Sequence, residues 1–463
     1  MSATAAALIE RLRAVLPNES LVTDPASLDA YRIDRAADPK AVPPLAVVRA
    51  ETTEHVQAAV RIAAELRVPI VPRGAGSGLS GGSASSDPAL VISLERMRDI
   101  SVDPVTRMAT VQPGALNAEV KQAAAQHGLW YPPDPSSFEF CSIGGNIATN
   151  AGGLCCVKYG VTSDYVLGLT VVLADGTVVR LGGPRLKDVA GLSLTKLFVG
   201  SEGTLGIVTE ATLRLIPAQA PPTTVVAVFS ELSQATDAVL EISRMTRPSM
   251  LEFMDRASIH AVERELRMGL DLEAAAMLVV QLDDGQGESL TEVERICTGL
   301  GATECYATVD AEEGEAFVVA RREVIPAVEK LGHLLLEDVG VPVPRLGELA
   351  GGIERIAAEH GLTIALIAHA GDGNTHPLIV VDPTDADQVA RGERAYGAIM
   401  DLAISLGGTI TGEHGVGRLK RPWLKPYLGN DVYELNLRIK RALDPDNLMN
   451  PGAVFSGGVG WAE

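Results

Sequence analysis

The chain has 463 residues, a formal net charge of −20, a hydrophobic share of 46% and an aromatic share of 4%. This length exceeds one ordinary hydrophobic core, so we expect two or three domains. The acidic balance argues against nucleic acid or an anionic membrane as a partner, and the scarcity of aromatic residues argues against a surface that stacks on bases.

Cysteine usage and the absence of long apolar runs predict a cytoplasmic protein. The five cysteines are odd in number and have no CxxC spacing, so we expect reduced thiols and no iron–sulfur cluster or zinc finger. No run approaches 18 apolar residues, so no membrane span is expected. Residues 1–16 carry Glu10, Arg11 and Arg13, and they predict a short amphipathic helix rather than a signal peptide.

The first glycine-rich loop covers residues 71–83, VPRGAGSGLSGGS. It follows a predicted strand–helix–strand unit over residues 42–70, with the helix at 53–66. Glycine lets the backbone approach a ligand closely, and consecutive N–H groups form a nest for anions. Arg73 places a cation at the entrance of the loop. The pattern predicts a cradle for a diphosphate, with a plain surface turn as the alternative.

This loop also matches G-x-G-x-x-G between Gly76 and Gly81. A dinucleotide fingerprint requires a helix that begins at the third glycine. Residues 82–88 show no helical period, and Pro88 precedes a strand-like run at 89–94. No GK[ST] follows the glycines either. We therefore expect neither a Rossmann turn nor a P-loop.

Two further glycine-rich segments follow, at residues 131–153 and 197–210. Between the loops we expect strands at 89–94 and 108–114, a helix at 115–127, and a hairpin turning at Asp175-Gly176. The second segment contains SIGGNIATNAGG and the third reads LFVGSEGTLGIVTE. A strand then ends near Pro217, and residues 217–222, PAQAPP, mark a domain boundary.

The second half alternates strands and helices. Strands are predicted at 223–229, 250–255, 275–283 and 302–309, and helices at 231–244, 258–267, 289–300 and 313–331. We expect a βαβ-type α+β sheet with helices on one face. The tail carries a helix at 430–443, followed by DPDNLMNPG.

Two short motifs carry candidate ligands, HAGDGNTH from His369 to His376 and GEHGVG from Gly412 to Gly417. The turn between His369 and His376 separates two apolar strands, so a hairpin would bring both imidazoles to one end of the sheet. We expect Glu413 and His414 on a third strand-like edge. Two histidines and a carboxylate suit a divalent metal with open positions. The alternative is that each histidine is an ordinary polar turn residue.

The three glycine-rich segments together resemble the FAD domain of the vanillyl-alcohol oxidase and p-cresol methylhydroxylase family. The two histidine motifs and the terminal LDPDNLMNPG resemble the cap of FAD-linked oxidases that act on glycolate, D-lactate or D-2-hydroxyglutarate. The implied fold class is α+β, with a two-subdomain PCMH-type FAD-binding domain and a ferredoxin-like cap. The implied parts are a lead-in at 1–41, the FAD domain at 42–218, the cap at 219–420, and a tail at 421–463 that returns to the FAD domain.

The resemblance implies FAD bound by the three segments and the tail. It is expected to be non-covalent, because Ser77 stands where some relatives carry a flavin-bonding histidine. The implied FAD contacts are Arg73, Gly74, Ala75, Gly76, Ser77, Gly78, Gly81, Pro133, Asp134, Pro135, Ser142, Ile143, Gly144, Gly145, Asn146, Ala148, Thr149, Asn150, Gly152, Gly153, Tyr159, Gly160, Glu202, Gly206, Ile207, Val208 and Asn450.

The resemblance also implies roles in the cap. His369, His376 and Glu413 would hold a zinc-like ion (Zn, Mn or Fe), and His414 would be the base. A metal lowers the pKa of a bound hydroxyl, and a neutral imidazole can then take its proton. Arg321 would clamp the substrate carboxylate, with Arg322 as the fallback and a solvated helix arginine as the alternative.

The implied reaction is oxidation of a small D-2-hydroxy acid, glycolate or D-lactate, to the 2-oxo acid by hydride transfer to flavin N5. Hydroxyglutarate enzymes carry a lysine and an asparagine where this chain has Leu336 and Leu378, and an apolar pocket disfavours a second carboxylate. Three alternatives stay open: a D-2-hydroxyglutarate-type dehydrogenase, a non-redox enzyme like alkylglycerone-phosphate synthase, and a non-catalytic FAD-binding subunit. We expect an external electron acceptor (a quinone, a cytochrome, an electron-transfer flavoprotein or an iron–sulfur subunit), and a homodimer is one option for assembly.

Overall fold

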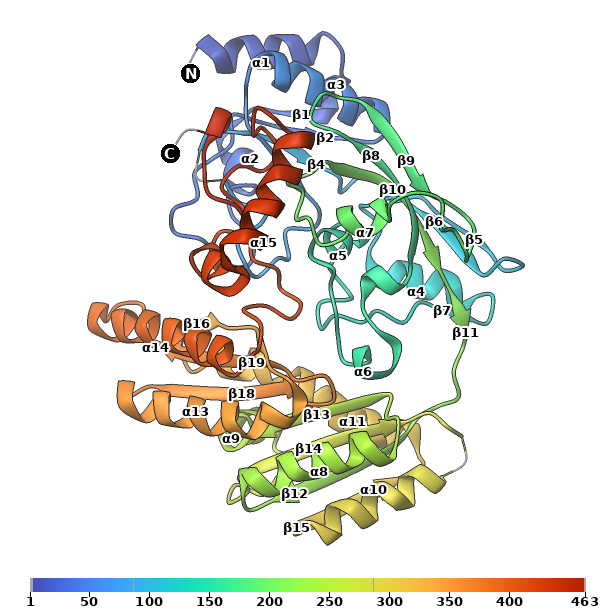
Figure 1. Cartoon of the computed structure of the whole chain (residues 1–463), viewed down its shortest axis with the longest axis vertical. Coiled ribbons are helices and arrows are strands. Elements are labelled where there is room, and N and C mark those ends of the chain that lie inside the picture. Colours follow the sequence, from blue (N-terminus) through green and yellow to red (C-terminus); the bar gives the residue numbers. More distant parts are fainter. Residues whose placement is uncertain (1–2, 86, 286, 462–463) are drawn as a thin grey trace. The chain divides into compact units, whose positions relative to one another are not determined.

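The computed structural model describes residues 3–85, 87–285 and 287–461. These residues form two compact units, each built from separate stretches of the chain (Figure 1). The first unit contains the residues up to 151, 161–218 and those from 413 on, and the second contains 152–160 and 219–412. The chain therefore leaves the first unit twice and returns to it twice.

A mostly parallel sheet opens the first unit, with strand order β1-β2-β4-β3. β2, β4 and β3 run parallel, and β1 pairs antiparallel with β2. The helices α1 and α3 bury their apolar faces in the same core cluster as these strands, which is the usual arrangement around a parallel sheet. The bounds are α1 Ala3–Arg13, β1 Leu21–Val22, α2 Pro25–Asp29, β2 Ala46–Arg49, α3 Thr53–Glu65, β3 Ile70–Arg73 and β4 Leu90–Ser93.

The path from β3 to β4 confirms that the first glycine loop is not a Rossmann turn. The loop begins directly after Arg73, and no helix forms among the described residues before Leu90. The predicted N-terminal helix forms as α1, while the first two residues of that prediction lie outside the described residues.

The first unit also contains an antiparallel sheet, in the order β5-β6-β10-β8-β9. The predicted hairpin joins β8 to β9, and Gly176 has the positive φ of +78° that its turn needs. Helices α4 and α5 pack in the core of this sheet. The bounds are β5 Ile100–Asp103, β6 Met108–Val111, α4 Asn117–Ala125, β7 Leu129–Trp130, α5 Ile143–Thr149, β8 Val166–Val172, β9 Val178–Gly182, α7 Leu194–Phe198, β10 Ile207–Arg214 and β11 Ile216–Pro217.

The C-terminal segment belongs to the first unit as well. Helix α15, Arg421–Leu443, is kinked at Gly429 (φ +75°), and the helix predicted at 430–443 is its second half. Buried Lys440 donates to the carbonyls of Thr204 and Met449 at 2.8 and 2.9 Å. Met449 also bridges Ile70 of β3, so the tail is held beside the strand that leads into the first glycine loop.

The second unit is built on an antiparallel sheet, in which the described residues form the strand order β15-β12-β14-β13-β18-β19-β16, with β17 pairing to β19 (Figure 1). Its strands are β12 Thr223–Phe229, β13 Met250–Asp255, β14 Ala276–Leu282, β15 Ala302–Thr308, β16 His333–Leu336, β17 Val339–Gly340, β18 Thr363–His369 and β19 Asn374–Val381. Its helices are α6 Cys156–Tyr159, α8 Leu232–Met245, α9 Arg256–Leu266, α10 Glu288–Gly299, α11 Ala311–Arg322, α12 Val324–Glu329, α13 Leu346–His360 and α14 Ala386–Ser405.

The expectation of a βαβ-type sheet with helices on one face was wrong. Every strand pair of this sheet is antiparallel. Val226 and Val228 of β12 join the core cluster with α9, α11 and α12, while their neighbours Val225 and Ala227 are buried on the opposite face, where α8 packs. Helices therefore cover both faces, and the strands read as continuous apolar runs for that reason.

The helix predicted over 313–331 is two helices, α11 and α12, which meet at Glu323. Pro326 lies in the first turn of α12. Its ring has no N–H to donate to the carbonyl of Arg322 and would clash with that carbonyl in a continuous helix. The break ends α11 at the two arginines, Arg321 and Arg322.

Candidate functional site

The first two glycine-rich segments meet at Ser142. Its hydroxyl accepts hydrogen bonds from the amides of Ala75 and Gly145, at 3.2 and 3.3 Å. A Cβ on Gly74 would lie 2.4 Å from this oxygen, which is closer than real atoms approach. Gly74 is therefore needed for the two segments to pack, and Ser142 also caps α5.

The third glycine-rich segment and the C-terminal tail are hydrogen-bonded to the first two segments. The amides of Gly200 and Glu202 donate to the carbonyls of Ile147 and Ala148, each at 2.8 Å. The side-chain amide of Asn450 donates to the carbonyls of Gly82 and Glu202 at 2.7 and 2.8 Å. Segments more than 360 residues apart thus form one network, and most of its donors and acceptors are backbone groups.

The first loop has the properties of an anion site. The amides of Gly76, Ser77 and Gly78 have no acceptor among the residues that the structure describes. Buried Arg73 lies beside them, since a Cβ on Gly76 (φ +70°) would stand 2.2 Å from its Nη2 atom. Unused amides next to a buried guanidinium fit the diphosphate of a dinucleotide cofactor.

Several predicted cofactor residues are engaged within the first unit. Asn146 Oδ1 and the carbonyl of Pro133 both accept from the side-chain amide of Asn117, at 3.1 and 3.2 Å. The side chain of Ile207 is buried in the core of the parallel sheet. The sequence prediction made this residue an FAD contact, and in the structure its backbone stands opposite Val172 in the pairing of β10 with β8.

The stretch 152–160, which holds the predicted residues Gly152, Gly153, Tyr159 and Gly160, belongs to the second unit. Asp283, which follows β14 by one residue, anchors it there. One carboxylate oxygen of Asp283 pairs with Lys158, and the other accepts from the hydroxyl of Tyr159. The loop of the second glycine-rich segment is therefore shared between the two units.

In the second unit, the predicted hairpin between His369 and His376 forms. β18 and β19 pair antiparallel, with His369 opposite Asn374 and Ile367 opposite His376. The two imidazoles lie on one face, with ring centroids 5.2 Å apart, and both are buried. Each ring offers a nitrogen within 4.8 Å of the other, which suits two ligands of one metal ion.

Glu252 on β13 is a functional candidate that the sequence reading missed. It stands directly opposite His369 in the sheet and is fully buried. Its Oε1 lies 2.8 Å from His369 Nδ1, and its Oε2 lies 2.8 Å from Nη2 of Arg321. Arg321 is itself 3% exposed, so it is not the solvated helix arginine of the alternative reading. Arg322 instead pairs with Glu315 near the surface.

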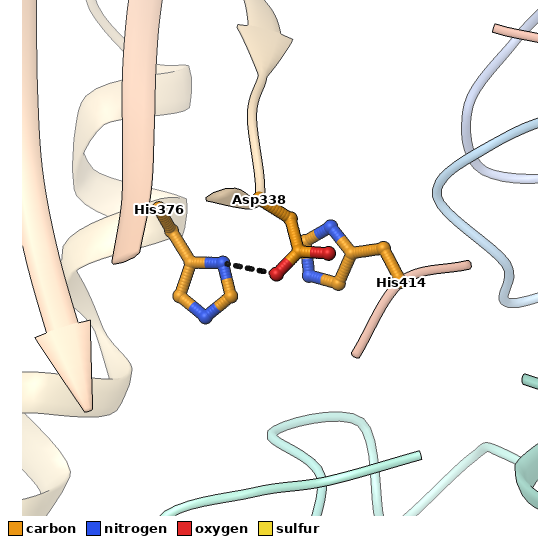
Figure 2. Close-up of side chains that lie close together, drawn as sticks. All are labelled: Asp338, His376 and His414. Carbon is orange, nitrogen blue, oxygen red and sulfur yellow. Dashed lines mark ion pairs between the residues drawn. The ribbon is translucent and has the colours of Figure 1, made fainter. Parts of the chain in front are cut away.

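Asp338, between β16 and β17, is the second missed carboxylate. It is fully buried, and its Oδ2 accepts from the hydroxyl of Thr411 and the amide of Gly412 at 2.6 and 3.0 Å. Its Oδ1 lies 3.8 Å from His376 Nδ1 (Figure 2). The signal that could have found both residues was an acidic residue within a short, mostly apolar run, in MLEFMD and LLLEDVGV.

Glu413 and His414 do not lie on a strand, contrary to the expectation. Residues 412–414 form a bend, and in this stretch Thr409 alone makes an isolated bridge, to Gly340. Glu413 follows Gly412, whose amide is bound by Asp338. The carbonyl of His414 accepts from Ser80 Oγ at 3.0 Å, within the first unit. Figure 2 also labels His414, the second residue after Gly412.

The segment after His414 is fixed by Glu202. Its two carboxylate oxygens accept from the amides of Val416 and Gly417 at 2.7 and 2.8 Å. Burial raises the pKa of Glu202 to about 7, although these hydrogen bonds act in the opposite direction. This side chain was predicted to be a cofactor contact, and in the structure it holds the loop that follows His414.

The residues fit a divalent metal at the histidine pair. If His369 donates its Nδ1 proton to Glu252, its Nε2 lone pair is presented for coordination, as is usual for a histidine ligand. Two fully buried carboxylates, Glu337 and Asp338, lie in the same unit, and burial with their charges raises the pKa of Tyr396 well above its ordinary value. Buried negative charge of this kind suits a cation.

Comparison with protein-family models gives two matches. A model described as the C-terminal domain of FAD linked oxidases matches residues 219–454. A model described as an FAD binding domain matches residues 44–182. Together the two matches span both units of the structure.

Curated relatives match most of the chain. The glycolate oxidase subunit GlcD of Bacillus subtilis is 41% identical over 89% of this chain and 89% of its own length. GlcD of Escherichia coli K12 is 39% identical over 88% and 83%. A D-lactate dehydrogenase of Archaeoglobus fulgidus is 35% identical over 92% and 95%.

A solved structure of p-cresol methylhydroxylase superposes with a TM-score of 0.82, covering 98% of this chain and 97% of that one at 18% identity. At this identity the likeness shows a common fold. The predicted PCMH-type architecture is therefore confirmed. Among the described residues, none of the helices combines the length and apolar character that crossing a membrane would need.

Proposed function

Because the chain belongs to the family of FAD-linked oxidases, we propose that it oxidises small D-2-hydroxy acids, glycolate or D-lactate, to the 2-oxo acids. It is an FAD-dependent oxidoreductase. The observation that carries the proposal is the buried cluster of His369, His376, Glu252 and Arg321 in the second unit, which offers ligands for a metal and a cation for a carboxylate.

The glycine segments of the first unit would hold the FAD. The amides of residues 76–78 and the guanidinium of Arg73 would bind its diphosphate, and Ser77 offers no side chain that bonds a flavin covalently. When bound, the flavin accepts the hydride from the substrate carbon. The protein's contribution is therefore to place that carbon and to remove the hydroxyl proton.

His369, His376 and Glu413 would hold a divalent cation of the zinc type (Zn, Mn or Fe). Such an ion supplies Lewis acidity to a hydroxyl group bound to it. Arg321 would bind the substrate carboxylate, and its burial strengthens a charge-assisted hydrogen bond. A ring nitrogen of neutral His414 would accept the hydroxyl proton, which suits imidazole near neutral pH.

The proposal of a small substrate rests on two leucines. Leu336 of β16 lies opposite Leu378 of β19, and both belong to the apolar cluster on the face that carries His376. A second carboxylate placed there would lose its hydration without gaining a partner. This supports glycolate or D-lactate over a D-2-hydroxyglutarate-type dicarboxylate.

The electrons must leave this chain to an external acceptor. None of its five cysteines has the spacing of an iron–sulfur motif. Two of the relatives carry the word subunit in their names. We therefore propose an external acceptor of the kind expected from the sequence: a quinone, a cytochrome, an electron-transfer flavoprotein or an iron–sulfur subunit.

Anaerobic mixing with a panel of D- and L-2-hydroxy acids tests the proposal. Glycolate or D-lactate should bleach the visible absorbance of the oxidised flavin, while L-lactate and D-2-hydroxyglutarate should do so much more slowly. Purified protein without flavin, or flavin that no hydroxy acid reduces, would contradict the proposed function and favour a non-redox flavoenzyme or a non-catalytic subunit.

The metal has its own test. Treatment with a chelator should slow the reduction, and a divalent cation should restore it. His376→Ala should lose the metal, whereas His333→Ala, which changes an exposed histidine of β16 in the same unit, should keep it. Unchanged metal content in His376→Ala, measured by elemental analysis, removes His376 from the ligand set.

A further inference from the structure

Glu252 makes two contacts with two different parts of the site. Its Oε1 lies 2.8 Å from His369 Nδ1, on the neighbouring strand β18, and its Oε2 lies 2.8 Å from Arg321 Nη2, on helix α11. The side chain is completely buried, and both partners are more than nine-tenths buried. One carboxylate therefore joins the histidine and the arginine.

The strand register produces this arrangement. Glu252 and His369 are direct partners across β13 and β18, so their Cβ atoms lie on the same face of the sheet at the distance of a cross-strand pair. The next pair on that face is Met254 with Ile367, whose other neighbour is His376 on β19. Glu252 is thus aligned across the sheet with the pair of residues next to the hairpin turn, His369 and Asn374.

Stability alone does not account for an acid at this position. The side chains around it on β13, from Leu251 to Met254, are apolar and buried. Burying a carboxylate is costly even when it is paired, and apolar residues of similar size are often equally stable or more so. The buried contacts of Glu252 on β13 with His369 on β18 and Arg321 on α11 therefore point to a functional requirement, namely that the imidazole and the guanidinium keep a fixed orientation.

We propose that Glu252 is a positioning residue that couples the metal site to the substrate clamp. It holds His369 in the tautomer protonated at Nδ1, so that Nε2 faces a metal, and it holds the plane of the Arg321 guanidinium for the substrate carboxylate. This inference rests on the proposed function, which assigns the metal to His369 and the carboxylate to Arg321. In this proposal Glu252 itself contacts neither the metal nor the substrate.

The proposed coupling predicts that loss of the Glu252 carboxylate weakens both metal binding and substrate binding. A carboxylate that accepts a hydrogen bond from Nδ1–H increases the basicity of a histidine ligand, and loss of such a partner typically weakens metal binding by about 10- to 100-fold. The same loss removes the carboxylate oxygen that lies 2.8 Å from Arg321 Nη2, and with it one constraint on the orientation of the guanidinium. One substitution at Glu252 should therefore raise the metal Kd and, at saturating metal, also raise the KM for the hydroxy acid.

Glu252→Gln in the full-length, FAD-loaded protein tests this. The variant keeps the size of the side chain, and we expect a Mn²⁺ Kd about 10-fold or more above that of the wild type, with KM raised at saturating Mn²⁺ and kcat affected less. Glu304→Gln, which changes an exposed acid of edge strand β15 in the same sheet, is the matched control and should change neither quantity.

A second readout does not depend on activity. In metal-free protein with ¹⁵N-labelled histidine, NMR should show one ring as the Nδ1–H tautomer, and the signal should be lost in His369→Ala, which assigns it. In Glu252→Gln the tautomer balance of this ring should shift. If the Gln variant does not fold, Glu252→Asp, which keeps the charge but is one methylene shorter, should change both readouts in the same direction.

The outcomes separate the two proposals. Unchanged metal affinity, KM and tautomer in Glu252→Gln would overturn the positioning role. A change in metal affinity with unchanged KM at saturating metal would also overturn it, because the coupling to Arg321 would be absent. Wild-type protein that binds no metal and whose flavin is not reduced contradicts the proposed function instead, and the tautomer measurement then still tests the contact between Glu252 and His369.

Discussion

The two units build their sites from different materials. In the first unit, the glycine segments present backbone amides, and the contacts between them are mostly backbone to backbone or backbone to a short side chain such as Ser142. In the second unit, the site is made of buried charged side chains, including Glu252, Arg321 and Asp338. One site depends on where the chain lacks side chains, and the other depends on which side chains meet.

This difference determines how each site tolerates change. A glycine segment fails when a Cβ is added where another segment touches it, so the damage is steric and affects packing. A buried ionic cluster fails when a single charge loses its partner, so the damage is electrostatic and affects ligand affinity. Substitutions at His414, Gly74, Asp338 and Glu202 test this distinction.

Replacement of the proposed base should have the largest effect. His414→Ala should retain FAD, because the backbone of this residue, not its ring, is held by Ser80. Flavin reduction by substrate should slow by about 10²- to 10⁴-fold, the usual contribution of a general base. Stopped-flow absorbance under anaerobic conditions measures it, and reduction at the wild-type rate would refute the assigned base.

A methyl group in the first glycine loop should cost stability rather than chemistry. Gly74→Ala places a Cβ 2.4 Å from Ser142 Oγ, so the first two segments must separate. We expect a loss of about 1–3 kcal/mol in the free energy of unfolding of the FAD-free protein. Gly78→Ala in the same loop, where the nearest atom would be 3.5 Å away, should cost much less. Equal urea denaturation curves for the two variants would contradict this steric account.

Loss of the charge on Asp338 should weaken ligand binding more than folding. Asp338→Asn keeps the shape of the side chain but weakens its hold on Thr411 and on the amide that precedes Glu413. We expect metal affinity to fall by about 10-fold. Competition with a chromophoric chelator measures it, and Asp385→Asn, at the N-cap of α14 in the same unit, is the control. Unchanged affinity would show that Asp338 does not organise the ligands.

Glu202 should give the smallest effect, a pH dependence of stability. Its pKa is raised to about 7 by burial, with Asp34 acting in the same direction and Lys420 and two backbone amides opposing. The stability that its protonated form contributes is complete below the pKa of the unfolded chain, near 4.5, and is lost as the pH rises through about 7. The unfolding free energy of FAD-saturated wild type should therefore fall by about 1 kcal/mol more than that of Glu202→Gln between pH 6 and pH 7. Parallel pH profiles would contradict the shift.

The local features of this protein could be predicted from its amino-acid sequence. The glycine-rich segments, the absence of a helix after Gly81, the Asp175-Gly176 turn and the hairpin between His369 and His376 could all be predicted, because backbone freedom and the alternation of apolar residues act over a few positions. The placement of Glu413 and His414 on a strand failed, because the bend there depends on Asp338, more than 70 residues earlier.

Which charged side chains meet depends instead on the order and register of strands that are far apart in the sequence. Nothing near Glu252 in the sequence indicates that β13 lies beside β18 and that α11 ends over the same row, yet that register makes an ordinary-looking acid the partner of both His369 and Arg321. The tertiary structure also assigned residues 152–160 to the second unit and 413–417 to the first. The physical reason is that a buried charge loses its hydration and must be compensated by an opposite charge or by hydrogen bonds. The fold supplies these from residues that are far away in the sequence.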